Sequence, residues 1–195
     1  MEQRLKLPVG IEFFDEIRTS GYYYIDKTKL IEQLLQNMGK VSLFTRPRRF
    51  GKTLNMSMLE CFFSNKYAGR SDLFEGLETW EDEAYRELQG TYPVVFLSFA
   101  KVKGTDFPMV KKQICKEIYH LYQIYDFLLE SDALSETDRH EFLSVNKNMD
   151  LADAADALYS LCRWLHAYYG KNVIVLIDEY DTPMQEAWLG GYWDE

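Results

Sequence analysis

The chain alternates short apolar runs with longer stretches in which apolar residues recur every three or four positions. The short runs are typical of strands, and they cover Val41–Phe44, Tyr92–Phe99 and Val173–Ile177. Because Tyr92–Phe99 is apolar almost throughout, we expect a strand that is buried on both faces. Strands that alternate with helices predict an α/β fold, with a parallel sheet flanked by helices and wound by right-handed crossovers.

Helical spacing predicts four helices between and after these runs. The first covers Leu30–Met38, the second follows a Gly-Lys-Thr sequence, and the third starts at about Pro108. The fourth is bracketed by Asp150 as its N-cap and Gly170 as its C-terminal stop. The apolar residues at helical spacing are Leu30, Ile31, Leu34, Leu35; Leu54, Met58, Leu59, Phe62, Phe63; Val110, Ile114, Ile118, Leu121, Tyr125; and Leu151, Ala154, Leu158, Leu161, Leu165 on the inward face.

Composition indicates one globular domain over residues 1–195, because 47% of the residues are hydrophobic. The net charge of -9 argues against a surface that gathers nucleic acid by bulk electrostatics. Cys61, Cys115 and Cys162 are widely spaced, so they predict small helical core residues rather than disulfides or a zinc site. With no leader and no apolar run of roughly 18 to 20 residues, we expect a cytoplasmic protein without membrane contact.

The stretch "FTRPRRFGKTL", Phe44–Leu54, ends like a phosphate-binding loop of the pattern G-x-x-x-x-G-K-[ST]. Arg46 stands where that pattern has its first glycine, and Pro47 follows it. A residue before proline favours extended geometry, so Arg46 can prolong the strand while Pro47 begins the loop with a fixed φ. The alternative is that the tripeptide Gly51-Lys52-Thr53 starts a helix and binds no ligand.

Each residue at the end of this stretch suits a nucleotide triphosphate. Gly51 lets the backbone approach the phosphates, Lys52 can reach the β and γ oxygens, and the Thr53 hydroxyl can ligate Mg²⁺. Arg48 and Arg49 can stabilise the γ-phosphate, contact a partner's acids or a nucleic-acid backbone, or simply be solvated. The predicted phosphate-binding residues are therefore Pro47, Arg48, Arg49, Phe50, Gly51, Lys52 and Thr53.

The second motif is "VIVLIDEYD", in which five apolar residues precede three acids. Asp178 would hold Mg²⁺ at the carboxyl end of the strand, and Glu179 would polarise the attacking water. A buried strand can end in an acid for solubility alone, which would account for Asp178 by itself. That explanation does not extend to the Gly-Lys-Thr loop, and in α/β sheets both motifs would lie where ligands bind. Together they predict a nucleotide site.

The blocks "YYYIDKTKLIEQLL", "FTRPRRFGKTLNMSML", "LFEGL", "YPVVFLSF" and "VIVLIDEYDTPM" resemble, in this order, those of the AAA-ATPase-like P-loop proteins of bacteria and archaea. The resemblance covers about Leu7 to Ala187, and it implies ATP as the nucleotide. The Arg-Pro-Arg-Arg entrance is usual in that family. The family is commonly fused to a nuclease-like domain of the PD-(D/E)xK type, which implies such a partner domain and nucleic-acid contact through it.

The resemblance also bears on residues outside the two motifs. It implies that Tyr24, Asp26 and Lys27 lie near the nucleotide, although Asp26 or Thr28 would more simply cap the following helix. It implies that Asp181 can reach the site, whereas Pro183 is expected to begin the next helix. In related ATPases a later strand with a sensor residue separates the loop strand from the acidic strand. We therefore expect the N-terminal part of a domain, truncated before that strand.

Three functions remain open on the sequence. The first is a Mg²⁺-dependent ATPase, with Lys52 and Glu179 as catalytic residues and Thr53 and Asp178 as metal ligands. The second is a nucleotide-gated binding module with little or no hydrolysis. The third and weakest is a DNA-binding module that uses the arginine-rich loop, against which the acidic balance argues. The sequence does not determine the oligomeric state, and a homo-oligomer is compatible with it.

Overall fold

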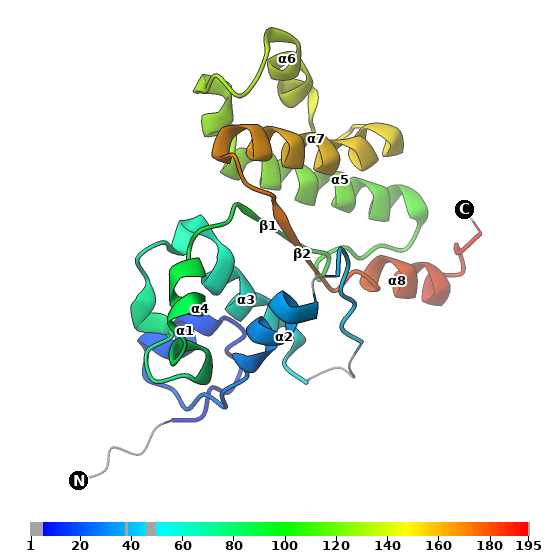
Figure 1. The fold of residues 1–195 in the computed structure, drawn as a ribbon. Helices are drawn as coiled ribbons and strands as arrows, with labels where there is room; N and C mark the ends of the chain where they lie inside the picture. Colours follow the sequence, from blue (N-terminus) through cyan, green and yellow to red (C-terminus); the bar gives the residue numbers. More distant parts are fainter. Residues whose placement is uncertain (1–5, 38, 46–49, 195) are drawn as a thin grey trace. The chain divides into compact units, whose positions relative to one another are not determined.

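The chain divides into two compact units, residues 1–94 and residues 95–195. The computed structural model describes residues 6–37, 39–45 and 50–194 (Figure 1). The helices of the first unit are α1 (Phe14–Thr19), α2 (Lys29–Asn37), α3 (Lys52–Phe63) and α4 (Glu83–Leu88), with short 3₁₀ turns η1 (Asn65–Tyr67), η2 (Ser71–Leu73) and η3 (Glu78–Trp80).

The first unit is built around α3, whose apolar face packs against α1 and the turns that follow. Phe14 and Phe62 are fully buried, and each ring packs against Phe74, with centroids 5.2 and 5.4 Å apart. The amide of Phe14 donates to the Ser57 hydroxyl at 3.0 Å, which ties α1 to the middle of α3. The predicted face of α3 is confirmed, because Met58, Leu59, Phe62 and Phe63 are all buried and Leu54 is half-buried.

The predicted strand Val41–Phe44 is wrong. Residues 41–45 adopt no regular secondary structure, and Val41 and Leu43 are 87% and 66% exposed. A β-strand exists only through a ladder of hydrogen bonds to a neighbour, and no other described residue forms one with this segment. The largely apolar sequence of this segment favours a strand, but a strand also needs a partner. By contrast α2 confirms the preceding helix, while its predicted last residue, Met38, lies outside the described residues.

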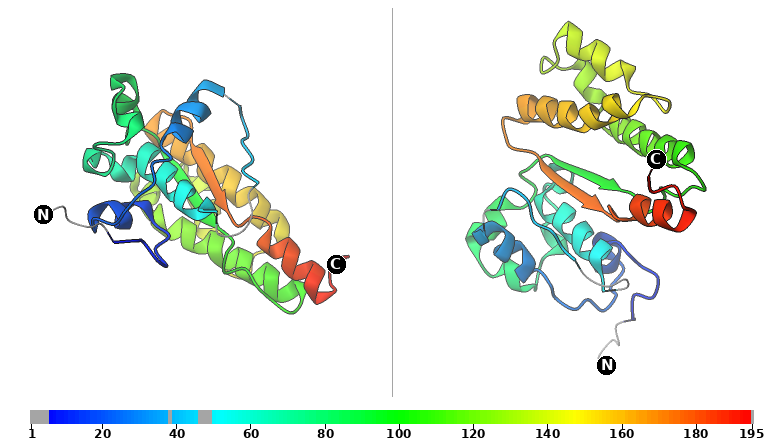
Figure 2. Two further views of the ribbon diagram at one scale, coloured as in Figure 1. Left: turned by 90° about the horizontal axis from the view of Figure 1, so that it is seen from below. Right: turned by 90° about the vertical axis from the view of Figure 1, so that its right-hand side faces the viewer.

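A two-stranded parallel sheet is formed by β1 (Val94–Ser98), which begins at the last residue of the first unit, and β2 (Ile174–Asp178) of the second unit. The helices of the second unit are α5 (Phe107–Ile124), α6 (Glu136–Ser144), α7 (Leu151–Tyr169) and α8 (Thr182–Gly190), with a 3₁₀ turn η4 (Asp126–Glu130). In Figure 2, α5 and α7 lie side by side on one face of the sheet. The mixed α/β class and the parallel pairing are as predicted.

The strands differ in how completely they are covered. In β1, Val94, Val95 and Leu97 are buried, close to the expectation for this segment. In β2, Leu176 and Asp178 are buried, whereas Val175 and Ile177 are each 38% exposed. The side chains of a strand alternate between faces, so one face of β2 is covered and the other is partly open.

Helix α7 begins and ends as predicted. Asp150 precedes α7, and its carboxylate accepts a hydrogen bond from the Asp153 amide at 2.9 Å. Gly170 ends the helix with φ of 65°, a left-handed conformation that glycine adopts without strain. The prediction was wrong for Leu151, which is 44% exposed, because the first turn of the helix extends beyond the core cluster. The third predicted helix corresponds to α5, capped by Asp106.

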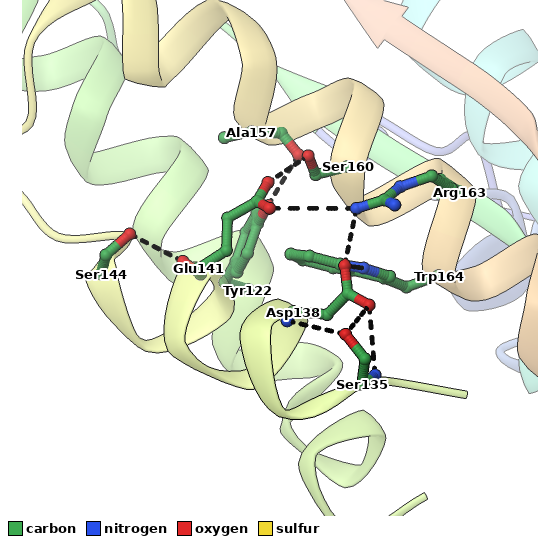
Figure 3. A network of polar contacts seen from close by, with 9 residues as sticks. All are labelled: Tyr122, Ser135, Asp138, Glu141, Ser144, Ala157, Ser160, Arg163 and Trp164. Carbon is green, nitrogen blue, oxygen red and sulfur yellow. Dashed lines mark hydrogen bonds and ion pairs between the residues drawn. The ribbon is translucent and has the colours of Figure 1, made fainter. Parts of the chain in front are cut away.

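A polar network joins α6 to α7 beside the core of the second unit (Figure 3). The Asp138 carboxylate accepts from the Ser135 hydroxyl at 2.6 Å and from Trp164 Nε1 at 2.9 Å. It also pairs with the Arg163 guanidinium at 2.7 Å. The Ser135 and Trp164 hydrogen bonds lower the pKa of Asp138 to about 2. The Asp138 carboxylate thus has a structural role, because its contacts hold α6 against α7.

The cysteines lie in helices, as predicted. Cys61 in α3 and Cys115 in α5 are buried, and Cys162 in α7 is half-buried. Burial raises the pKa of Cys61 to about 12, which suits an inert core residue rather than a nucleophile. Within residues 6–37, 39–45 and 50–194, no helix is long and apolar enough to cross a bilayer.

Candidate nucleotide site

The loop half of the candidate site lies at the start of α3. Gly51 precedes the helix with φ of 72°, in the left-handed region, and its amide carbonyl accepts the first helical bond, from Asn55 N at 2.9 Å. A Cβ at this position would meet no atom within 4 Å. Glycine is therefore favoured here by backbone conformation and not by crowding.

Lys52 and Thr53 occupy the first turn of α3, and both are half-buried. The first amides of a helix have no partner inside the helix, and the helix dipole places partial positive charge there. The first turn of α3 contains no acidic residue that would offset this charge. The turn therefore combines amide donors, an ammonium group and a hydroxyl, which is the donor set that a bound phosphate needs.

The entrance to the loop is only partly described. Phe50 is 63% exposed immediately before Gly51. Pro47, Arg48 and Arg49, which the sequence assigns to phosphate binding, lie outside the described residues, as does Arg46. Their predicted roles stay predictions.

The acidic half of the candidate site lies at the end of β2. Asp178 is the last residue of the strand, as predicted, and it is 4% exposed. Its carbonyl oxygen accepts from the Phe99 amide at 3.0 Å, which fixes the strand end to the residue that follows β1. Asp178 therefore lies at the carboxyl end of a parallel strand, which is where ligands bind in α/β sheets.

Glu179 follows with φ of 52°, the one non-glycine residue with a positive φ across the described ranges. A left-handed conformation costs an L-residue about 1–2 kcal/mol. Such outliers concentrate at functional sites, where the surrounding structure holds them in place. The conformation turns the chain sharply between β2 and α8, so the Glu179 side chain leaves the alternation of the strand.

Asp181 and Thr182 complete the corner between β2 and α8, which comprises residues 178–182. The Thr182 hydroxyl donates to Glu179 Oε2 at 3.3 Å, and the Thr182 amide donates to the Glu179 carbonyl at 3.0 Å. Asp181 Oδ2 accepts from Gln185 Nε2 at 2.5 Å, whereas Asp181 Oδ1 is buried with no hydrogen-bond partner among the described residues. Pro183 lies in the first turn of α8, as predicted. The sequence interpretation did not single out Thr182, although a threonine three residues after the acid and just before proline was a usable signal.

The residues ahead of α2 have structural partners. Asp26 Oδ1 accepts from the Thr28 amide at 2.8 Å and the Thr28 hydroxyl at 2.7 Å, and Oδ2 accepts from the Glu78 amide at 2.7 Å. Burial alone would raise the pKa of Asp26, but these donors together lower it. Asp26 thus joins the start of α2 to η3. The Tyr24 ring packs on Phe14 at 5.0 Å, and burial raises the pKa of its hydroxyl to about 12.

A magnesium ion at this site would need ligands from the nucleotide as well as from the protein. Among the described residues, no three His, Cys, Asp or Glu side chains form a protein-only metal cage. Mg²⁺ at nucleotide sites takes one or two protein ligands and fills its other positions with phosphate oxygens and water. Asp178 and Thr53 could supply those two ligands. Thr53 belongs to the first unit and Asp178 to the second, so their convergence on one ion stays a prediction.

Comparison with known proteins supplies independent information. A family model described as a predicted AAA-ATPase matches residues 8–192. An uncharacterized protein from the vnfD 5′ region of Azotobacter chroococcum mcd 1 is 31% identical over 182 residues, which is 93% of this chain. The chain spans 30% of the length of that relative. No solved structure matches the chain.

Proposed function

Because the chain belongs to the family of predicted AAA-ATPases, we propose that it binds Mg-ATP at the start of α3 and hydrolyses it with the acidic end of β2. The observation that carries this proposal is the conformation of Gly51, left-handed and directly before Lys52 and Thr53 in an acid-free first turn. The residue before a helix more commonly has an extended backbone and a side chain that caps the first amides, whereas Gly51 has neither.

Each residue has a distinct role in the proposed site. Lys52 and the first amides of α3 bind the β- and γ-phosphates, and the open backbone at Gly51 lets them approach. The Thr53 hydroxyl and the Asp178 carboxylate hold Mg²⁺, which when bound neutralises charge on the phosphate oxygens. Arg48 and Arg49 add positive charge beside the γ-phosphate.

Glu179 orients the water that attacks the γ-phosphate and accepts its proton. Phosphoryl transfer requires little covalent chemistry from the protein, so positioning and electrostatic stabilisation supply most of the catalysis. The left-handed backbone at Glu179 supports this role, because it directs the side chain away from the strand at a cost in stability.

In this proposal the sheet formed by β1 and β2 belongs to one ATPase domain. A nuclease-like domain, nucleic-acid contact through it, and assembly into a homo-oligomer are implied by the family resemblance alone.

Two measurements on the same preparation test the proposed function. Equilibrium titration with a fluorescent ATP analogue, with and without Mg²⁺, should give saturable binding that Mg²⁺ strengthens. Steady-state phosphate release should then exceed the rate of the Lys52→Ala variant. Tight binding without release would favour a nucleotide-gated module, and absence of binding would refute the proposal. A salt-sensitive DNA affinity that Arg48→Ala and Arg49→Ala abolish would instead support the DNA-binding function.

A further inference from the structure

The corner between β2 and α8 holds Glu179 from two directions. The Thr182 amide fixes the Glu179 carbonyl, and the Thr182 hydroxyl donates to the Glu179 carboxylate at 3.3 Å. Thr182 is 7% exposed, so its hydroxyl has little access to water. A single buried residue therefore contacts both the backbone and the side chain of the proposed general base.

We propose that Thr182 is a positioning residue for Glu179, which it holds in the direction required for activating water. This inference rests on the proposed function. Ordering a glutamate side chain costs rotamer entropy, which a fixed hydrogen bond can offset before the nucleotide arrives. A general base that is already oriented loses less entropy in the transition state.

The local structure supports a dedicated role for this hydroxyl. The Asp181 side chain makes no capping bond to α8, so the first turn of this helix lacks the usual contribution from that position. Thr182 directs its hydroxyl back to Glu179, three residues before it. Pro183 has no amide hydrogen, and its fixed φ restricts the backbone next to Thr182. The backbone at Thr182 is thus restrained by its amide bond to the Glu179 carbonyl and by the proline that follows.

A purely structural role is the competing explanation, because a buried hydroxyl needs an acceptor wherever it lies. The two explanations differ in what depends on Glu179. If Thr182 acts through Glu179, its removal should lower turnover without weakening Mg-ATP binding, and it should have no further effect once Glu179 is changed. If it only stabilises the fold, its removal should lower the unfolding temperature and leave turnover per folded molecule unchanged.

The test compares Thr182→Val, Thr182→Ala and Thr182→Ser, alone and combined with Glu179→Gln. Valine keeps the branched shape without the hydroxyl, alanine avoids that branch if valine fails to fold, and serine restores the hydroxyl. We expect kcat to fall about 10- to 100-fold in the valine and alanine variants, with Kd for Mg-ATP unchanged. Serine should recover most of the rate. In the Glu179→Gln background, Thr182→Val should not reduce the rate further.

The possible outcomes separate this inference from the proposed function. Wild-type kcat in Thr182→Val and Thr182→Ala, with an inactive Glu179→Gln, would overturn the role of Thr182 and leave the ATPase proposal intact. An additive loss in the double variant, or failure of serine to restore the rate, would also overturn it. Wild-type turnover in Glu179→Gln, or no turnover in the unmodified chain, would overturn both.

Discussion

Helices α7 and α8 both have an aspartate at the N-cap position, but only the aspartate of α7 caps its helix. Asp150 has an extended backbone, with φ of -77° and ψ of 177°, and its carboxylate accepts from the Asp153 amide. Asp181 has a helical backbone, with φ of -82° and ψ of -12°, and makes no capping bond. One of its oxygens is buried without a partner in the described part of the chain.

This difference separates a structural acid from an acid at a proposed site. At α7 the local rules for helix starts, backbone geometry and hydrogen bonding all agree. At α8 they disagree, because a capping bond is missing, an oxygen is unsatisfied and Glu179 is left-handed. Natural proteins tolerate such conflicts mainly where function requires them. Substitutions at residues 178–182 are therefore expected to affect function, whereas those at the start of α7 should affect stability.

The largest expected effect is on turnover at this corner. Glu179→Gln removes the proton acceptor while keeping the size of the side chain, so phosphate release should fall about 10²- to 10⁴-fold. Mg-ATP affinity, measured by equilibrium titration, should stay within twofold of wild type. Glu186→Gln, on the adjacent α8, is the matched control and should retain wild-type turnover. Equal rates in the two variants would remove Glu179 from the mechanism.

The second prediction compares the two aspartates directly. Asp150→Ala should lower the free energy of unfolding by about 1 kcal/mol, because it removes a capping hydrogen bond from α7. For a chain of this length, that corresponds to a melting temperature about 2–4 °C lower. Asp181→Ala should cost less stability, since it removes no cap. Thermal unfolding of both variants measures the difference. A larger fall in melting temperature for Asp181→Ala would mean that Asp181, and not Asp150, is the structural acid.

A smaller effect on stability is expected from relieving the backbone strain at Glu179. Glycine adopts a positive φ without steric cost, so Glu179→Gly should raise the free energy of unfolding by up to about 1 kcal/mol, offset in part by the greater freedom of the unfolded chain. The same variant should lose turnover. Denaturant titration beside Glu179→Gln checks the gain, because glutamine keeps the left-handed cost. Lower stability in the glycine variant would show that φ of 52° is not a source of strain.

The last expected effect appears only in acid, in the pH dependence of the free energy of unfolding that the network at α6 contributes. The folded pKa of Asp138 is lowered to about 2 from a reference of 3.8, so its contribution is fully present above about pH 4. It is then lost as the pH falls towards 2. Relative to wild type, Asp138→Asn should remove this part of the pH dependence. Denaturant titrations from pH 5 to pH 2 would show it, with Asp132→Asn as the exposed control. If the free energy of unfolding fell equally with pH in wild type and Asp138→Asn, the stabilising role of the Asp138 carboxylate would be contradicted.

Most of the fold could be predicted where local signals decide the structure. Asp150 and Gly170 bracket α7 because caps and stops act within one helical turn. The segment at Val41–Phe44 could not be predicted in this way, since a strand depends on a distant partner. The partial exposure of Val175 was likewise hidden, because a run of apolar residues does not reveal how many faces of a strand are covered.

The candidate site shows a similar division. Gly51, Lys52 and Asp178 follow from motif spacing, and the structure places them at a helix start and a strand end as the motifs require. The left-handed conformation of Glu179 and the contribution of Thr182 did not follow from spacing. Both belong to the turn between β2 and α8, whose geometry the spacing of a motif does not reveal.

The central claim is that the start of α3 binds the phosphates of ATP, and one binding measurement tests it most directly. Lys52 and Lys29 are the first residues of α3 and α2, so Lys29→Ala is a matched control at an equivalent position. We predict that Lys52→Ala weakens Mg-ATP binding about 10- to 100-fold, as expected for the loss of a charged hydrogen-bond donor. Lys29→Ala should leave Kd unchanged. Equal affinities for wild type, Lys52→Ala and Lys29→Ala would contradict the claim.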